Sequence, residues 1–445
     1  MWSILLLAAS IALIVLVTTR LRLHPFVALL LAAFFFGTLD GLQPIEIVAA
    51  INSGFGETVG AVGIVIIAGS IIGTFLNHSG AAMRLASGFV QLAGRRRVPV
   101  AMGAVGYVVS MPVFCDSGFV LLSSINRALA ARAGVSLAAC AVALSLGLYA
   151  THTMVPPTPG PVAAAGIIGA DLGIVIGIGA IVSLVALSAG LVFAYRYAAR
   201  IDIGHEAPAV EDVVEQAAEE GPSMPRSLLP IVLPILLIVG RTIADVPSAP
   251  FGDGTLAASL KFFGEPAIAL SIGVVLALTL PERFELRMLS TSGWFGEAIK
   301  SAATIIVITG AGGGFGSVLQ ASGIATDLGT ETVARFGGVL LPFLVAAAIK
   351  TAQGSSTVAM ITTAGIIAPM LGTLGLDGEV ARAMTVVAIG AGSMVVSHAN
   401  DSYFWVVTQF SGMTVNQGYR LQTLGTLVQG TAAAAAVWIM SLFIL

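Results

Sequence analysis

Long apolar segments follow one another along almost the whole chain, and short clusters of polar, proline or glycine residues separate them. Many of these segments approach the ~20 apolar residues that an α-helix needs to cross the hydrocarbon core of a bilayer. The chain has 445 residues, of which 57% are hydrophobic and 10% are charged. This pattern predicts an all-α polytopic membrane protein whose surface is mostly in contact with lipid.

Two stretches of the sequence carry the same residues at the same spacing, which indicates an internal repeat. Seven residues of the first stretch recur 243 positions later. The matched pairs are Gly69 with Gly312, Gly73 with Gly316, Leu76 with Leu319, Ser79 with Ser322, Gly80 with Gly323, Ala82 with Ala325 and Leu85 with Leu328. A duplicated apolar chain with matching interruptions is typical of secondary transporters. We therefore interpret the chain as two copies of one membrane unit.

Basic residues favour the cytoplasmic side of a membrane and so give the direction of the spans. Arg20 and Arg22 follow the first apolar segment, whereas a secretory signal has its basic residues before it. That segment is therefore predicted to be a retained span with an external N-terminus. Spans over 25–40 and 58–77 then return the chain to the cytoplasm, at the arginines of 95–97.

Two irregular segments complete the first half. Residues 98–134 are too long for one span and have arginines near both ends, which predicts a re-entrant hairpin with its tip near 112–118. The following span, 136–171, contains four prolines between 156 and 161, and proline cannot continue a helix. It is therefore predicted to be broken, and residues 173–195 return to the cytoplasm.

The second half repeats this plan. We predict spans over 227–246, 264–281 and 301–325, a hairpin over 337–374, a broken span over 380–412 and a last span over 423–445. Five spans plus one hairpin in each half is an odd number of crossings, so the second copy must be inverted. The predicted domains are a first membrane repeat over 1–198, an acidic cytoplasmic linker over 199–226 and a second membrane repeat over 227–445.

Four interruptions hold nearly all the polar residues at membrane depth. They are 111–118, 152–161, 350–357 and 397–402. The 243-residue offset places 111–118 opposite 354–361 and 155–161 opposite 398–404, so the interruptions pair across the repeat. Unwound backbone is tolerated inside a membrane only where protein or a water-filled cavity satisfies its polar groups. Paired breaks therefore predict a substrate site near the midplane, built from discontinuous helices.

The residues at these breaks suit a small anionic substrate. Free amides at the N-terminal ends of half-helices favour a carboxylate, and neighbouring hydroxyls suit a polyhydroxylated molecule. The predicted substrate-binding residues are Ser117, Gly118, Pro156, Pro157, Gly354, Ser355, Ser356, Thr357, Ser397, Asn400 and Ser402.

Five ionisable residues also lie in the breaks, although each costs ~2.5 to 3.5 kcal/mol on membrane-insertion scales. Asp116 and Asp401 are predicted, with equal rank, to carry a coupled proton; the alternative is that each is a buried group paired with a neighbour. His152 and His398 are further candidates for proton coupling, but a histidine that caps a broken helix is an equally good interpretation. Lys350 is expected to extend its amine toward the surface.

Charge and cysteine content narrow the possible partners. A net charge of −3 provides no basic face for nucleic acid. Cys115 and Cys140 are the only cysteines, so neither a disulfide framework nor a thiolate metal site is indicated. The glycine run over 310–316 lacks the strand and the Lys-Ser of a phosphate-binding loop and is interpreted as close helix packing. We predict no cofactor and no metal site.

Five segments stand in order along nearly the whole chain: MPVFCDSGFVLL, HTMVPPTPGPVAAA, GAGGGFGSVLQASGIA, AAIKTAQGSSTVAMITTAGIIAP and GAGSMVVSHANDSYFWVV. Together they resemble the gluconate permease family of bacterial proton symporters. The resemblance implies proton-driven uptake of gluconate or a related sugar acid across the bacterial inner membrane. It also implies the architecture of the wider ion transporter superfamily, with inverted repeats, two re-entrant hairpins, a dimerising scaffold and an elevator-like transport domain.

Three other functions are alternatives. A membrane-embedded enzyme would need a metal or nucleophile motif, and the sequence contains neither HExxH nor GxSxG. A channel would not require paired breaks with titratable groups. A sodium-coupled carrier of another small hydroxy acid or of D-serine stays open, because hairpin tips rich in Ser, Thr and Asn also suit sodium.

Overall fold

The computed structural model describes residues 2–85, 88, 97–204, 221–245, 251–252, 254–323, 338–399 and 401–445. Its regular secondary structure, over these residues, consists entirely of helices. Seven of the described segments are long and apolar enough to cross a membrane, and an eighth is formed by a bent helix pair. The predicted fold class, an all-α polytopic membrane protein, is confirmed.

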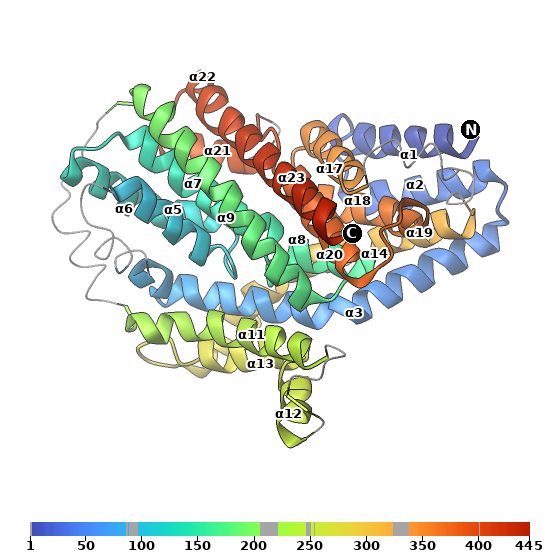
Figure 1. Ribbon diagram of the computed structural model, residues 1–445, viewed down its shortest axis with the longest axis horizontal. Coiled ribbons are helices and arrows are strands. Elements are labelled where there is room, and N and C mark those ends of the chain that lie inside the picture. Colours follow the sequence, from blue (N-terminus) through green and yellow to red (C-terminus); the bar gives the residue numbers. More distant parts are fainter. Residues whose placement is uncertain are drawn as a thin grey trace.

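The first half contains a long helix, a hairpin and a broken span (Figure 1). Its elements are α1 (Trp2–Thr19), α2 (Pro25–Asp40), α3 (Pro44–His78), α5 (Val98–Val109), α6 (Cys115–Ala133), α7 (Leu137–Met154), α8 (Pro159–Ile168), α9 (Leu172–Arg196) and η2 (Ala198–Arg200). The pair α5 and α6 forms the hairpin predicted over 98–134, and the pair α7 and α8 forms the broken span.

The second half follows the same order of elements. They are α11 (Met224–Asp245), α12 (Thr255–Phe263), α13 (Pro266–Ala277), η3 (Leu286–Leu289), α14 (Trp294–Ala321), α17 (Leu340–Gln353), α18 (Ser356–Ile367), η4 (Ala368–Met370), α19 (Leu371–Leu374), α20 (Glu379–Ser393), α21 (Ser402–Phe410), α22 (Val415–Gly418), η5 (Tyr419–Thr423) and α23 (Leu424–Ile444). Helices α17 and α18 form the second hairpin, and α20 and α21 form the second broken span. Each of these begins close to 243 residues after its counterpart.

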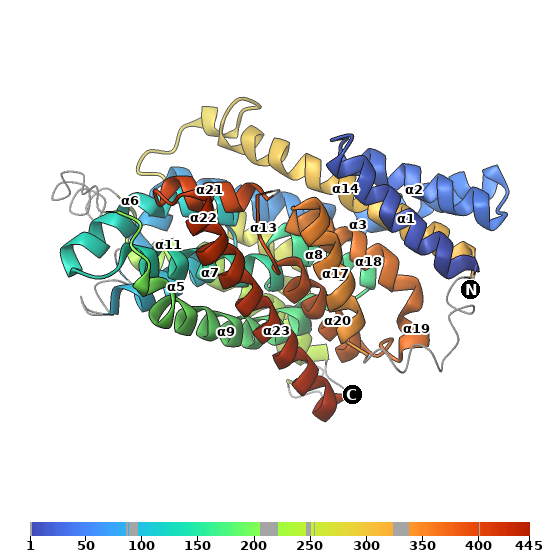
Figure 2. The same ribbon diagram turned by 90° about the horizontal axis from the view of Figure 1, so that it is seen from above.

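Helices α3 and α14, which correspond in the repeat, run antiparallel along the length of the molecule (Figure 2). Near the start of α3, Gly54 lies against Gly313 in the second half of α14. At the end of α3, the imidazole of His78 contacts the carboxylate of Glu297 in the first turn of α14. Corresponding helices with opposite directions show that the second copy is inverted.

The packing of the remaining elements confirms a two-fold relation between the halves. Helix α2 packs on α14 while its counterpart α13 packs on α3. Similarly, α8 packs on α18 while α21 packs on α6, and the corresponding helices α9 and α23 lie side by side. This mutual exchange of contacts is the pattern that a two-fold axis between two copies produces.

Two features of the fold differ from the predicted spans. Helix α3 begins at Pro44 rather than near residue 58, because Pro44 suits the first helical position and the Glu46 carboxylate accepts a hydrogen bond of 2.9 Å from the Gln43 N–H. Helix α12 was not predicted, and it meets α13 at an angle of 72°. Within the predicted linker over 199–226, residues 205–220 lie outside the described residues.

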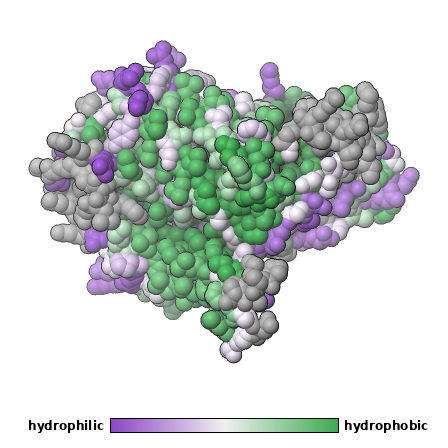
Figure 3. Space-filling model, viewed as in Figure 1, coloured by the Kyte–Doolittle hydropathy of each residue, from purple (hydrophilic) through white to green (hydrophobic). Residues whose placement is uncertain are grey.

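The surface agrees with a membrane protein. Hydrophobic side chains cover the middle of the face in Figure 3, and hydrophilic ones gather mainly toward the ends of its long axis. Of the long helices, α3 lies broadly along this axis in Figure 1, whereas α9 and α23 cross it obliquely. An apolar face of this kind agrees with a surface in contact with lipid.

Close packing of α3 on α14 depends on glycine. A Cβ atom on Gly313 would lie 2.6 Å from the carbonyl oxygen of Gly54, and backbone cannot move away cheaply. We expect Gly54→Ala or Gly313→Ala to destabilise the protein by about 1 to 3 kcal/mol through overpacking. Thermal unfolding in detergent measures this effect. Gly60→Ala, on the same helix α3 but with open space around it, is the matched control. Equal stability of Gly54→Ala and Gly60→Ala would contradict the prediction.

Candidate functional site

Four interruptions of the helices come together inside the protein, two from each half. They are the hairpin tips between α5 and α6 and between α17 and α18, and the breaks between α7 and α8 and between α20 and α21. Aromatic contacts connect the first-half tip to both breaks. The ring centroids of Phe114 and His152 lie 6.0 Å apart, and those of Phe119 and Tyr403 lie 6.3 Å apart.

The second-half tip joins the same cluster. A Cβ atom on Gly160, at the start of α8, would lie 3.9 Å from the Cα of Thr357 at the start of α18. On the α3 side, a Cβ on Gly69 would lie 2.9 Å from the carbonyl oxygen of Pro157, and Gly73 lies against the carbonyl oxygen of Pro112. Gly69 and Gly73, which belong to the repeated stretch, thus allow α3 to pack directly on unwound backbone.

A buried ion pair lies at the centre of this cluster. Lys350, in the last turn of α17, is fully buried, and its Nζ donates a hydrogen bond of 2.6 Å to Oδ2 of Asp401. The same ammonium donates to the carbonyl oxygen of Gly354. The prediction that Lys350 extends to the surface is wrong. Its position at the end of α17 places its amine against the Asp401 carboxylate and the Gly354 carbonyl group instead of at the surface.

Both oxygens of Asp401 have partners. Besides Lys350, the hydroxyl of Ser397 donates to Oδ2 at 2.5 Å, and the backbone N–H of Tyr403 donates to Oδ1 at 3.1 Å. The second contact also makes Asp401 the N-terminal cap of α21. Asp401 is therefore a paired, capping carboxylate, which is the structural alternative considered for it in the sequence analysis.

Asp116 has a different environment. It lies in the first turn of α6, close enough to Asp401 and Lys350 to interact electrostatically with both. Its Oδ1 atom is buried and makes no hydrogen bond within the described part of the chain. A neighbour of the site, Nδ1 of His152, is buried and unpartnered in the same sense. Buried polar atoms normally have partners, so these two atoms are suited to contact a bound molecule.

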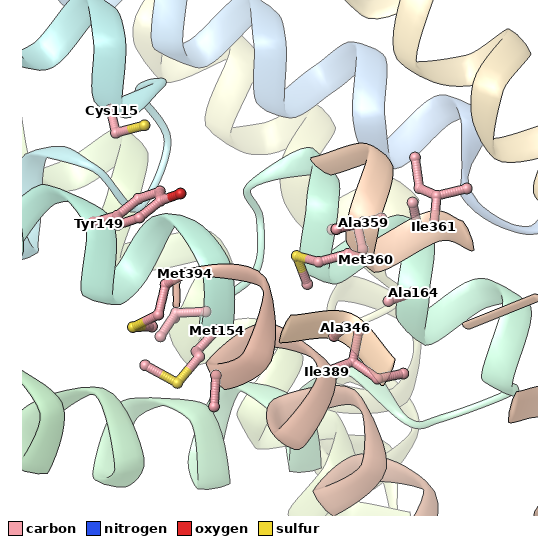
Figure 4. Close-up of a cluster of buried hydrophobic side chains, with 14 of the residues drawn as sticks. Cys115, Tyr149, Met154, Ala164, Ala346, Ala359, Met360, Ile361, Ile389 and Met394 are labelled. Carbon is pink, nitrogen blue, oxygen red and sulfur yellow. The ribbon is translucent and has the colours of Figure 1, made fainter. Parts of the chain in front are cut away.

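Tyr149 connects the two halves of the site. Its ring lies 5.0 Å from that of Tyr403 between centroids, and the Lys350 Nζ lies 6.0 Å from the centroid of the Tyr149 ring. In Figure 4 the Tyr149 hydroxyl points away from α7, toward the side of the cluster where Met360 of α18 lies. Methionines surround this region, with Met154 and Met394 packed below Tyr149 in the same view.

The other predicted residues divide between exposed and buried positions. The exposed ones are Ser117, Ser355 and Ser402, Thr357 is half-buried, and the buried ones are Gly118, Pro156, Pro157, Gly354, Ser356 and Ser397. The Ser355 hydroxyl accepts a hydrogen bond of 3.3 Å from the N–H of Val358 and so caps α18. Asn400 lies outside the described residues.

A side-chain contact of His398 and the backbone conformation of Val396 characterise the break between α20 and α21. Nε2 of His398 lies 2.9 Å from the carbonyl oxygen of Thr351, so this histidine ties the break to the end of α17. Val396 has a φ of 56°, which is rare for a β-branched residue. Such strain persists only where surrounding contacts hold the backbone in the unfavourable conformation, as they do at many functional sites.

A cavity of about 410 Å³ opens beside Asp116. It is lined by Asn77, His78, Asp116, Ser117, Val120, Leu121 and Glu297. Nε2 of His78 lies 3.0 Å from Oε2 of Glu297, and the His78 ring stacks on Trp294 with 5.0 Å between centroids. Sequence reasoning missed His78 and Glu297 as cavity residues, because 219 positions separate them. The only available signal was the repeated Phe-Gly-Glu at 55–57 and 295–297.

A second cavity, of about 450 Å³, lies at the other end of the antiparallel pair α3 and α14. Its polar lining includes Glu57, Thr58, Ser317, Gln320 and Arg382. Gln320 stands 243 positions after Asn77, so the two cavities share this lining position through the repeat. Among the described residues, no three His, Cys, Asp or Glu side chains gather closely enough to hold a metal ion.

The Lys350–Asp401 pair predicts a large effect on stability. Asp401→Asn would leave a buried ammonium without a counter-charge, so we expect a loss of roughly 3 to 5 kcal/mol. The double variant Lys350→Met with Asp401→Asn removes both charges and is expected to recover much of this loss. Thermal unfolding in detergent compares the variants.

Asp245→Asn provides the matched control. It removes the shared carboxylate of two solvent-accessible ion pairs. Oδ1 of Asp245 lies 3.0 Å from Nζ of Lys261, and Oδ2 lies 3.6 Å from Nε of Arg241. Exposed pairs contribute about 0 to 1 kcal/mol. If Asp401→Asn were no more destabilising than Asp245→Asn, the buried pair would not hold the second hairpin and break together.

Comparison with known proteins gives one family over the whole chain. Residues 2–443 match the family described as GntP family permease. The chain is 36% identical over 447 residues to a gluconate permease of Pseudomonas aeruginosa, covering 98% of this chain and 96% of that protein. It is 34% identical over 450 residues to the D-serine transporter DsdX of Escherichia coli K12, covering 100% and 99% respectively.

A solved structure shares the fold. The chain resembles the YdaH transporter of Alcanivorax borkumensis, described as having an unusual topology, with a TM-score of 0.67. The likeness covers 94% of this chain and 98% of that one at 14% sequence identity. At this identity the comparison supports the arrangement of helices and says nothing about the substrate.

Proposed function

The chain belongs to the GntP permease family, and on that premise we propose that it is a proton-coupled carrier which takes up gluconate or a related sugar acid across the bacterial inner membrane. The observation that carries the proposal is the environment of Asp116. Its carboxylate has a buried oxygen with no hydrogen-bond partner in the described ranges of the chain, and it lines a cavity next to the paired Lys350 and Asp401.

The substrate class follows from the groups around the cluster. Helices α6, α8, α18 and α21 all begin at it, so their positive dipole ends face a common region and favour a carboxylate. The exposed hydroxyls of Ser117, Ser355 and Ser402 stand at three of these helix starts and suit the hydroxyls of a sugar acid. Relatives named as gluconate and D-serine carriers both act on small polar carboxylates, which agrees with this arrangement.

The charges around the site give a reason for coupling. The Lys350 ammonium balances the Asp401 carboxylate, so an ionised Asp116 would carry the one uncompensated negative charge among the three. A carboxylate substrate would then meet a like charge where water is scarce, and that repulsion is strong at low dielectric. Protonated Asp116 removes the repulsion and donates a hydrogen bond. Substrate and proton therefore bind together.

Release of the substrate follows from the same electrostatics: when Asp116 loses its proton, the repulsion between the two carboxylates returns. The cavity that Asp116 shares with the His78–Glu297 pair lies at one end of the antiparallel pair α3 and α14. The cavity near Glu57 lies at the opposite end of that pair. We propose that the site is exposed to these two ends alternately, by an elevator-like movement of the hairpins within a homodimer.

We expect Asp116→Asn to separate exchange from accumulation. Asparagine keeps the size of aspartate but cannot release a proton. Reconstituted in proteoliposomes, the variant should lose at least about tenfold in gluconate accumulation driven by a pH gradient, while gluconate exchange across the membrane continues. Glu285→Gln, which neutralises an exposed carboxylate paired with Arg287, should leave both activities unchanged.

Accumulation by Asp116→Asn at the level of the unmodified protein would show that Asp116 is not the obligatory proton carrier. Asp401, His152 and His398 would then be tested in the same way. Of these, His152 is the next candidate, because its Nδ1 atom has no partner in the described part of the chain.

A substrate panel tests the proposed chemistry. Gluconate, idonate and D-serine are added to proteoliposomes with an imposed pH gradient, with a sodium gradient, or with neither. We expect gluconate or idonate to be accumulated with the pH gradient and to exceed D-serine, because several hydroxyls line the cluster. Accumulation that follows the sodium gradient alone would support the sodium-coupled alternative. Equilibration without accumulation under all conditions would indicate a channel.

A further inference from the structure

The Lys350 ammonium lies among oxygen atoms of the kind that hold a monovalent metal ion. It contacts the carboxylate of Asp401 and the carbonyl oxygen of Gly354, which follows the C-terminal end of α17. The Ser397 hydroxyl bonds to the same carboxylate oxygen. Carboxylate, hydroxyl and unwound carbonyl oxygens at the C-terminal end of a half-helix are also the groups that coordinate sodium in secondary transporters.

Local backbone geometry brings this set together. Gly354 has a φ of 92°, a conformation that favours glycine, and its N–H donates a bond of 2.8 Å to the carbonyl oxygen of Lys350. The hairpin therefore turns so that the side chain of Lys350 meets the carbonyl group of Gly354 four residues later. The partner Asp401 comes from the break between α20 and α21 of the same half, 51 positions away. The oxygen set is thus a property of the folded cluster.

We propose that Lys350 is the resident cation of this site: its tethered ammonium occupies the place of a monovalent metal ion and thereby makes transport independent of sodium. The inference rests on the proposed function as a carrier and deepens it, because it assigns the choice of coupling ion to one residue. Asp401 supplies the negative charge that requires a cation at this place. Asp116 remains the group that takes up and releases the coupled proton.

A different role for Lys350 makes a different prediction. An ammonium has three N–H donors, and Asp401 and Gly354 account for two. If the third donor bound the substrate carboxylate, removal of Lys350 would raise the KM for substrate, and sodium would have no effect. If Lys350 is the resident cation, its removal leaves a vacant anionic site that sodium can fill.

The test is the dependence of Lys350→Ala on sodium. The purified protein and its variants are unfolded thermally in detergent, in sodium chloride or in choline chloride at the same ionic strength. The unmodified protein should have the same unfolding midpoint in both salts. Lys350→Ala should have a midpoint several degrees higher in sodium chloride, because an ion that binds only the folded state stabilises it.

Two variants check that the effect belongs to this site. Lys350→Arg keeps a cation and should show no preference for sodium. The double variant Lys350→Ala with Asp401→Asn removes the anionic ligand together with the ammonium, and it too should show no preference. Lys300→Ala removes an exposed lysine and controls for the change in net charge.

Transport provides the second readout. In proteoliposomes, Lys350→Ala should accumulate substrate at least about tenfold more with sodium than with choline, whereas the unmodified protein should not distinguish the two salts. The unfolding measurement does not depend on transport, so it decides the role of Lys350 even if the substrate or the coupling ion of the proposed function is wrong.

The proposal is overturned if the unfolding midpoint of Lys350→Ala is the same in both salts. It is also overturned if the unmodified protein is itself stabilised by sodium to the same extent. Recovery of folded Lys350→Ala only when sodium is present during purification would support it. Failure to recover folded Lys350→Ala in either salt, while the double variant folds, would count against it, because sodium would then not replace the ammonium.

Discussion

The buried ion pair between Lys350 and Asp401 is the constraint on which the arrangement of the site depends. Removing two charges from water is costly, and the attraction between them compensates only when other polar groups complete their hydrogen bonds. Ser397, Tyr403 and Gly354 complete them here. Because these partners come from a hairpin and a broken span, satisfying one pair of charges fixes the relative position of both elements.

Much of this architecture is predictable from the sequence, because hydropathy and proline record where a chain can and cannot cross a membrane. The hairpins, the broken spans and the inverted repeat all follow from apolar segment lengths, from the 243-residue match and from the parity of crossings. The position of Lys350 could not be predicted in this way. Hydropathy gives the order of segments but not the depth at which a hairpin turns, and Lys350 lies in the last turn before that point.

Long-range pairing is the other part that the sequence does not provide. The contact of His78 with Glu297, and the exchange of helix contacts between the two halves, depend on how separate segments meet in space. The same applies to the two aspartates, which have equal rank in the sequence. Only the folded arrangement shows that Asp401 has partners for both oxygens, while Asp116 has an oxygen without a partner among the residues that the structure describes.

The two-fold relation between the halves has a consequence for the energetics of the transport cycle. If each half can adopt the conformation of the other, an exchange of their conformations converts a state open to one side of the membrane into a state open to the other side. A chain with two identical halves would populate these two states equally. In this chain the two halves carry different side chains at the positions of the buried ion pair and of Asp116. The 243-residue offset places Tyr107 opposite Lys350, Thr158 opposite Asp401 and Ala359 opposite Asp116. In such a cycle the backbone would supply two equivalent states, and these few charged side chains in unmatched places would set the energy difference between them.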